Sequence, residues 1–284
     1  MTALENKCAI KMENITKRFG SVVANNAINM ELREGEILSL LGENGSGKTT
    51  LMNMLSGIYF PDEGQIYIHD KPVTIASPKD AFDLGIGMIH QHFKLVDLFT
   101  ATENIILGLE GKLDLNNARK KVQDICDRYG FDIDPDMKIY DMSVSQKQTV
   151  EIVKVLYRGA DILILDEPTA VLTPQETDKL FAVMRNMKAD GKSLIIITHK
   201  LHEVLDVSDR VAVLRKGEYI GDVMTKDADQ QSLTDMMVGH SVTLNINRPD
   251  PINVTPRLKL EGLTVFDELG VKRLDDVSFT INAG

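Results

Sequence analysis

One eight-residue segment restricts the fold of this 284-residue chain more than any other. Residues 42–49 read Gly-Glu-Asn-Gly-Ser-Gly-Lys-Thr, which fits G-x-x-x-x-G-K-[ST]; an apolar run at 37–41 precedes them and a helical pattern follows from Thr50. In that order the glycines let backbone N–H groups turn toward phosphates, and the helix N-terminus adds its positive dipole end. A glycine-rich turn that only reverses the chain is the weaker interpretation. The segment predicts a phosphate loop.

Each residue of this predicted loop has an expected role. Lys48 pairs with β- and γ-phosphate oxygens, and Thr49 is a ligand of Mg²⁺. The other residues expected to contact a nucleotide are Gly42, Glu43, Asn44, Gly45, Ser46, Gly47 and Thr50.

Short apolar runs recur along the chain, as in parallel strands that are covered on both faces. They lie at residues 37–41, 86–89, 162–165 and 194–197. Helical patterns fall between them, and the clearest has Thr173 as N-cap, Pro174 in its first turn and Glu176 closing a capping box. Strands that alternate with helices predict an α/β fold with a mostly parallel sheet.

Two further regions do not follow that alternation. The first ~35 residues and residues 67–74 have strand-like alternating patterns, which predict an antiparallel β subdomain. Residues 97–142 are expected to form a compact helical insert, with a helix over 116–129. The predicted fold class is therefore α/β, a P-loop NTPase core with an antiparallel β subdomain and a helical subdomain.

Composition excludes several classes of protein. The formal charge of −10 argues against general nucleic-acid binding, which needs a basic surface. The two cysteines are far apart and predict neither a disulfide framework nor a zinc site, as in a cytosolic protein. No apolar run approaches the ~20 residues that span a bilayer, and residues 1–7 do not resemble a secretory signal.

Two carboxylates follow the apolar run at 162–165. Asp166 and Glu167 would lie at the carboxyl end of a buried strand, where open α/β sheets bind ligands. Asp166 could then hold Mg²⁺ through water, and Glu167 could act as a general base on the attacking water. Taken alone such a pair is more often a solvated turn, but a phosphate loop in the same chain favours the functional interpretation.

With these motifs in order, residues ~8–240 resemble the ATP-binding subunit of an ABC transporter. The resemblance implies that Gln91 contacts Mg²⁺ and reports to the membrane subunit, and that His199 touches the γ-phosphate. It also implies that Phe19 stacks on adenine. Without the family, these residues would be interpreted as an exposed amide, a structural histidine and a core phenylalanine.

Two segments depart from the family pattern. Residues 142–146, Met-Ser-Val-Ser-Gln, stand where the signature Leu-Ser-Gly-Gly-Gln is usual, so the helical region is interpreted as the signature subdomain. Ser143, Ser145 and Gln146 are expected to meet a nucleotide held by the opposite domain, while Ser143 and Gln146 also fit a capping box. Ser145 adds a side chain where the backbone must approach closely. Thr173 stands where the D-loop usually has Asp.

These departures, with residues 90–96 and 167–176, are most similar to the tandem ATPases of sugar and nucleoside importers. An internal repeat supports this, because residues 258–264 copy residues 10–16 and, with one inserted residue, Gly284 aligns with Gly35. The predicted domains are an ABC ATP-binding domain at 1–240, a proline-containing linker at 241–257 and the start of a second ABC domain at 258–284.

The resemblance implies an ATP-binding and ATP-hydrolysing subunit of an importer for nucleosides or simple sugars, with ATP and Mg²⁺ as cofactors. Its expected partners are permease subunits, a second ATP-binding domain and, indirectly, a solute-binding protein, at the cytoplasmic face of the membrane. Alone, the chain should be weakly active. Two alternatives stay open: a soluble ABC ATPase of DNA repair or translation, and an ATP-sensing module without turnover.

Overall fold

The computed structural model describes residues 7–91, 93–109, 111, 114–240, 254–267 and 270–283. They fall into two compact units that divide between residues 242 and 243, and each unit is described by itself. His92, Gly284 and most of the predicted linker lie outside the described residues. Among the helices described, none combines the length and the apolar character that a bilayer span requires.

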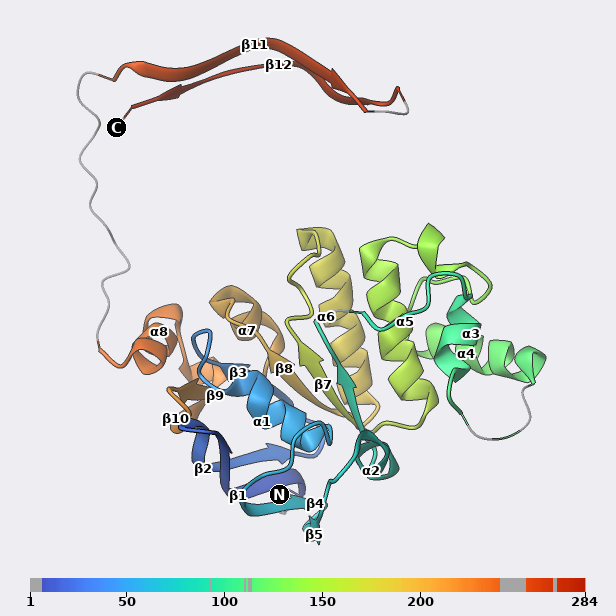
Figure 1. Ribbon diagram of the computed structural model, residues 1–284, viewed down its shortest axis with the longest axis vertical. Coiled ribbons are helices and arrows are strands. Elements are labelled where there is room, and N and C mark those ends of the chain that lie inside the picture. Colours follow the sequence, from blue (N-terminus) through green and yellow to red (C-terminus); the bar gives the residue numbers. More distant parts are fainter. Residues whose placement is uncertain are drawn as a thin grey trace. The chain divides into compact units, whose positions relative to one another are not determined.

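A six-stranded sheet forms the centre of the larger unit, in the order β10-β9-β3-β8-β7-β6 (Figure 1). All neighbours pair in parallel except β10, which runs antiparallel to β9. The strands are β3 (Ile37–Leu41), β6 (Ile86–Ile89), β7 (Ile162–Asp166), β8 (Ser193–Ile197), β9 (Arg210–Arg215) and β10 (Glu218–Met224). These pairings confirm the predicted mostly parallel sheet. Every residue of β3, β7 and β8 is buried, as expected of strands that are covered on both faces.

Alternate residues of the central strands lie on opposite faces of the sheet and enter different cores. On one face, Leu38 and Leu40 pack with α1 and the antiparallel sheet. On the other face, Ile37 packs with α5 and α6, whereas Leu41 packs with α7 and α8. The helices that cover or flank the sheet are α1 (Lys48–Leu55), α2 (Pro78–Asp83), α5 (Val144–Tyr157), α6 (Pro174–Ala189), α7 (Leu201–Val207) and α8 (Gln230–Val238). The predicted capping box at Thr173 and Glu176 is present.

The antiparallel subdomain has the strand order β2-β1-β4-β5. Its strands are β1 (Cys8–Phe19), β2 (Val22–Arg33), β4 (Glu63–Ile68) and β5 (Lys71–Val73). The alternating stretch predicted at 67–74 contains a tight turn, because His69 and Asp70 have φ values of 48° and 60° between the paired residues Ile68 and Lys71. Positive φ at both central residues is the geometry that two-residue hairpins favour.

The helical subdomain has a core of its own. It comprises α3 (Ala101–Ile106), α4 (Leu115–Tyr129) and the short 3-10 helix η1 (Ile139–Asp141). Val150 and Val153 of α5 belong to the same core, so this subdomain extends past residue 142, where the predicted insert ends.

The smaller unit contains one antiparallel hairpin, β11 (Pro256–Phe266) with β12 (Lys272–Asn282). Pro256 and Arg257, which the sequence interpretation gave to the linker, already lie in β11. This hairpin has the same register as β1–β2. The equivalent pairs are Ile10↔Leu32 and Leu258↔Ile281, Met12↔Met30 and Leu260↔Phe279, and Ile15↔Ile28 and Leu263↔Val277.

Candidate functional site

Backbone carbonyl groups of the loop between β3 and α1 bind the lysine at the end of that loop, Lys48. Lys48 is 7% exposed, and its Nζ donates to the carbonyl oxygens of Gly42 at 2.7 Å and Glu43 at 3.0 Å. Burial lowers the pKa of the Lys48 ammonium, while the nearby charges of Glu167 and Asp166 oppose that shift. The cation is therefore held in place by backbone oxygens next to two carboxylates.

Two glycines of the loop are required by close approach. A Cβ on Gly47, at φ 97°, would lie 2.4 Å from the carbonyl oxygen of Ala24, and a Cβ on Gly42 would lie 2.3 Å from that of Leu214. Both distances are shorter than any tolerable contact, so a side chain at either position would displace the loop from its neighbouring strands.

The carboxyl end of β7 brings two acids toward this loop. Thr49 Oγ1 donates to Asp166 Oδ2 at 3.4 Å. Burial and the charge of Glu167 raise the pKa of Asp166, and the Thr49 hydrogen bond and Lys48 oppose the change. Glu167 has φ 50°, a conformation that an L-residue adopts only when its surroundings hold it, and its N–H donates to the Ile197 carbonyl at 2.9 Å.

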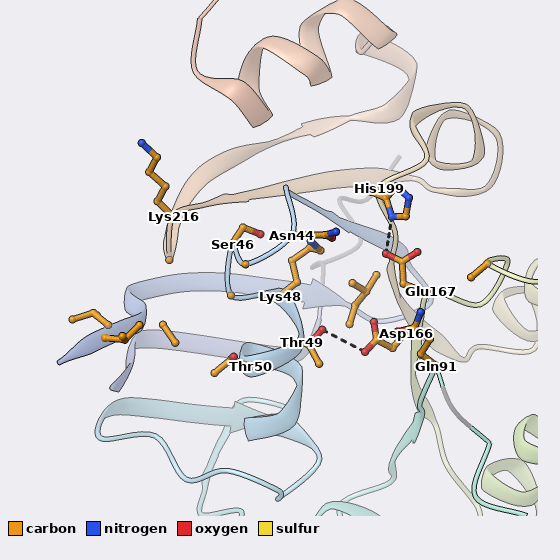
Figure 2. Close-up of a pocket in the computed structure, with 18 residues that line it drawn as sticks. Asn44, Ser46, Lys48, Thr49, Thr50, Gln91, Asp166, Glu167, His199 and Lys216 are labelled. Carbon is orange, nitrogen blue, oxygen red and sulfur yellow. Dashed lines mark hydrogen bonds and ion pairs between the residues drawn. The ribbon is translucent and has the colours of Figure 1, made fainter. Parts of the chain in front are cut away.

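His199 completes this edge of the sheet. Its Nδ1 lies 2.8 Å from Glu167 Oε1, and Figure 2 shows the imidazole directly above the carboxylate. The Glu167 side chain is 14% exposed, whereas that of His199 is 55% exposed. A mostly covered carboxylate thus contacts an accessible imidazole.

A cavity of about 690 Å³ opens between the loop and the strand ends (Figure 2). The predicted residues that line it are Asn44, Gly45, Ser46, Gly47, Lys48, Thr49, Thr50, Gln91, Asp166, Glu167 and His199. Ser46 Oγ is buried and has no hydrogen-bond partner among the described residues. Thr49, Gln91 and Asp166 offer oxygen atoms of the kind that Mg²⁺ prefers, so these residues fit a magnesium ion.

Some predicted residues lie elsewhere. Gly42 and Glu43 do not line the cavity but hold Lys48 through their carbonyl oxygens. Phe19 also stays out of the lining: its ring is half exposed and packs edge-on against Tyr59, with 5.2 Å between ring centroids. A stack of Phe19 on adenine stays a prediction.

The signature segment lines a second cavity, of about 600 Å³, with residues of α5 and α6. Ser143 Oγ accepts from the Gln146 N–H at 3.3 Å, and Gln146 Oε1 accepts from the Ser143 N–H at 3.0 Å, so the predicted capping box is present. Ser145 Oγ lies 3.1 Å from Ser143 Oγ. These side chains satisfy one another and are not part of the phosphate-loop cavity.

Sequence reasoning missed one wall of the first cavity. Val22, Val23 and Ala24 line it from the start of β2, and Lys216 and Gly217 line it from the turn between β9 and β10. Gly217 N–H donates to the Ser46 carbonyl at 3.1 Å, which joins that turn to the phosphate loop. The apolar pair at a hairpin tip and the Lys-Gly turn were the available signals, but neither indicates which cavity it lines.

Comparison with known proteins agrees with this geometry. Residues 25–170 match the model of the ABC transporter family. The chain is 48% identical over 285 residues to the nucleoside import ATP-binding protein NupA of Lactococcus lactis subsp. cremoris (strain MG1363), covering 99% of this chain and 56% of that protein. It is 49% identical over 279 residues to the guanosine import ATP-binding protein NupO of Bacillus subtilis (strain 168), covering 97% of this chain and 55% of that protein.

A solved structure shares the fold. The crystal structure of a nucleotide-free ATP-binding cassette from an ABC transporter superposes with a TM-score of 0.73 at 27% identity, covering 81% of this chain and 97% of that one. The chain spans about half the length of the curated relatives it matches. The family model covers the phosphate loop, Gln91, the signature segment and both acids, and so this chain belongs to the ABC transporter family of ATP-binding proteins.

Proposed function

We propose that this chain binds and hydrolyses ATP as part of an ABC importer for nucleosides or simple sugars. The observation that carries the proposal is the single cavity into which the phosphate loop, two carboxylates, an amide and an imidazole converge. Such a set matches phosphoryl transfer, in which catalysis depends on positioning and on stabilisation of charge.

The phosphate loop supplies the binding step. Its backbone N–H groups and the start of α1 favour an anion. When nucleotide binds, the Lys48 ammonium exchanges its bonds to the two carbonyl oxygens for bonds to phosphate oxygens. Thr49, Asp166 and Gln91 would hold Mg²⁺. When bound, that ion neutralises charge on the β- and γ-phosphate oxygens.

Glu167 and His199 supply the hydrolytic step. The Glu167 carboxylate accepts the proton of the attacking water, and its backbone conformation and its contact with His199 fix the direction of that carboxylate. His199, being more exposed, is placed to donate to the γ-phosphate.

A second nucleotide-binding domain completes each site in this proposal. The signature segment lines a different cavity from the phosphate loop, so within one chain it does not cover the nucleotide. The register shared by β1–β2 and β11–β12 supports a second ABC domain that begins in the smaller unit. Full activity then needs that domain or a second copy of this chain.

The solute and the partners are inferred from the relatives. Two proteins almost half identical to this chain are named for nucleoside and guanosine import. We therefore propose that the chain works with permease subunits at the cytoplasmic face of the membrane, that a solute-binding protein delivers the solute, and that nucleic acid is not a partner.

A dilution series of ATPase rate tests the enzymatic part. The rate per molecule should rise with protein concentration, because two phosphate loops and two signature segments must meet. ATP binding with no phosphate release at any concentration would instead indicate an ATP-sensing module. Co-purification with a permease, and nucleoside uptake that needs this chain, test the transport part against a role in repair or translation.

A further inference from the structure

Next to the contact between Glu167 and His199, a second set of bonds joins the loop after β7 to the loop after β8 and to α7. Thr169 Oγ1 donates to Glu203 Oε2 at 2.5 Å. Lys200 Nζ donates to the Thr169 carbonyl at 2.9 Å and to Glu203 Oε1 at 2.9 Å. Thr169, Lys200 and Glu203 thus form a closed cluster, which we call the Thr169 clamp.

Two members of the clamp are buried, and Lys200 is partly exposed. Thr169 is 1% exposed and Glu203 is 5% exposed. A buried carboxylate is costly unless donors satisfy it, and here a hydroxyl and an ammonium do so. Because each member depends on the other two, the three side chains have little freedom to move apart.

The place of the clamp suggests what it does. Thr169 follows Glu167 by two residues after β7, and Lys200 directly follows His199 after β8. The loop is also held on its other side, because Gln148 Nε2 of α5 donates to the Pro168 carbonyl at 2.6 Å. Of the described residues, those that line the phosphate-loop cavity include no member of the clamp. The clamp therefore acts on the loop and not on a nucleotide.

We propose that Thr169, Lys200 and Glu203 are positioning residues, which fix the distance between the ends of β7 and β8 and so hold the Glu167 carboxylate against His199. Glu167 has a left-handed backbone that its own side chain does not favour, and the loop needs external bonds to keep it. This inference rests on the proposed function, in which Glu167 is the general base.

The sharpest test compares Thr169→Val with Thr169→Ser. Valine keeps the volume of threonine but has no hydroxyl to donate to Glu203, whereas serine keeps the donor. For Thr169→Val we expect turnover to fall about tenfold to hundredfold, as for a base displaced by a fraction of an ångström, and the Kd for ATP to stay within about twofold. Thr169→Ser should keep turnover within about threefold of the parent chain.

Two further variants separate positioning from folding. Lys200→Ala removes the bond to the Thr169 carbonyl from a more exposed position, and it should also lower turnover. This variant tests the proposal even if Thr169→Val does not fold. Lys192→Ala is the matched control, because Lys192 pairs with Asp161 where β7 and β8 begin, and it should leave turnover unchanged.

The outcomes are distinct. If the parent chain binds ATP but does not hydrolyse it when concentrated, the proposed function fails and this inference fails with it. If the parent hydrolyses ATP and the valine and serine variants match it, only the clamp is disproved. A parallel loss of ATP affinity, thermal stability and turnover in Thr169→Val and Lys200→Ala would show a purely structural role and would also overturn the proposal.

Discussion

The phosphate loop and the signature segment both lie at the start of a helix, and in the proposed function both meet phosphate, yet they are built in opposite ways. Lys48 is buried, and loop residues 44–49 line one cavity together with Asp166 and Glu167. Ser143 is exposed and Ser145 is half-buried, and the side chain of Gln146 caps the helix of its own chain. The phosphate loop presents polar groups to a cavity in which a ligand can bind them, whereas the polar side chains of the signature segment already form hydrogen bonds within that segment.

The two designs fit different steps of the proposed cycle. A half-site that must bind nucleotide before pairing needs its charged groups fixed in advance, which burial and backbone bonds achieve for Lys48. A half-site that must dock and release repeatedly is better exposed and internally capped. Variants in the two regions should therefore affect different measurements.

The largest effect is expected from Glu167→Gln. The amide keeps the shape of the carboxylate but cannot accept a proton, so turnover should fall by about 10²–10⁴ while ATP affinity is retained. Steady-state phosphate release from concentrated protein measures the turnover. Asp161→Asn, at the start of the same strand, is the control and should not change it. Unchanged turnover in Glu167→Gln would mean that Glu167 is only a turn residue.

The next effect is expected from Lys48→Ala. Loss of a charge-assisted bond to phosphate, worth roughly 1.5–3 kcal/mol, should raise the Kd for ATP about ten- to hundredfold. A nucleotide titration measures it, with circular dichroism to check the fold. Lys216→Ala removes another cation that lines the same cavity and should have a smaller effect. Parent-like affinity in Lys48→Ala would refute the phosphate-loop assignment.

Ser143→Ala should affect the stability of the signature segment without affecting ATP binding at the phosphate loop. Removal of the hydroxyl that accepts from Gln146 should lower the free energy of unfolding by about 1 kcal/mol, the usual value of an N-cap. Urea unfolding checks this, and Ser143→Asp, which keeps a cap, should recover most of the loss. The Kd for ATP should not change; a weakened Kd would show that the signature segment acts within its own chain.

The smallest effect is expected from Ser145→Gly. If the Ser145 side chain crowds the opposing nucleotide by about 1 kcal/mol, its removal should lower the protein concentration for half-maximal turnover about fivefold. The dilution series measures this concentration. Ser145→Ala keeps the Cβ without the hydroxyl, so it should fall between parent and glycine. A higher concentration in Ser145→Gly would show that Ser145 assists pairing.

The parts of the fold that sequence predicts well are those with a local cause. The strand Ile37–Leu41 is apolar except for Ser39, as expected of a strand covered on both faces, and the start of α6 follows from Thr173, Pro174 and Glu176. The phosphate loop also follows from local chemistry, because Gly47 permits an approach to β2 that no other residue allows.

Long-range packing explains what sequence reasoning did not predict. The cavity wall formed by Val23 and Gly217 joins residues far apart in the chain, and nothing local marks them as neighbours. The same holds for the clamp, because Thr169 lies in the loop after β7 and Glu203 lies in α7. Val150 joins the helical core because α5 serves two cores at once, which a linear pattern does not reveal.

The shared register of the two hairpins also bears on the order of folding. Ile15 of β1 is buried in the core of the larger unit, whereas Leu263 occupies the same position in a hairpin whose side chains are mostly exposed, and both pair identically. The register is therefore set by nearby residues, and such pairing takes about 1–10 μs. Ile37 of β3 must instead find Leu194 of β8, so closure of the central sheet, and not the hairpin, should limit the folding rate.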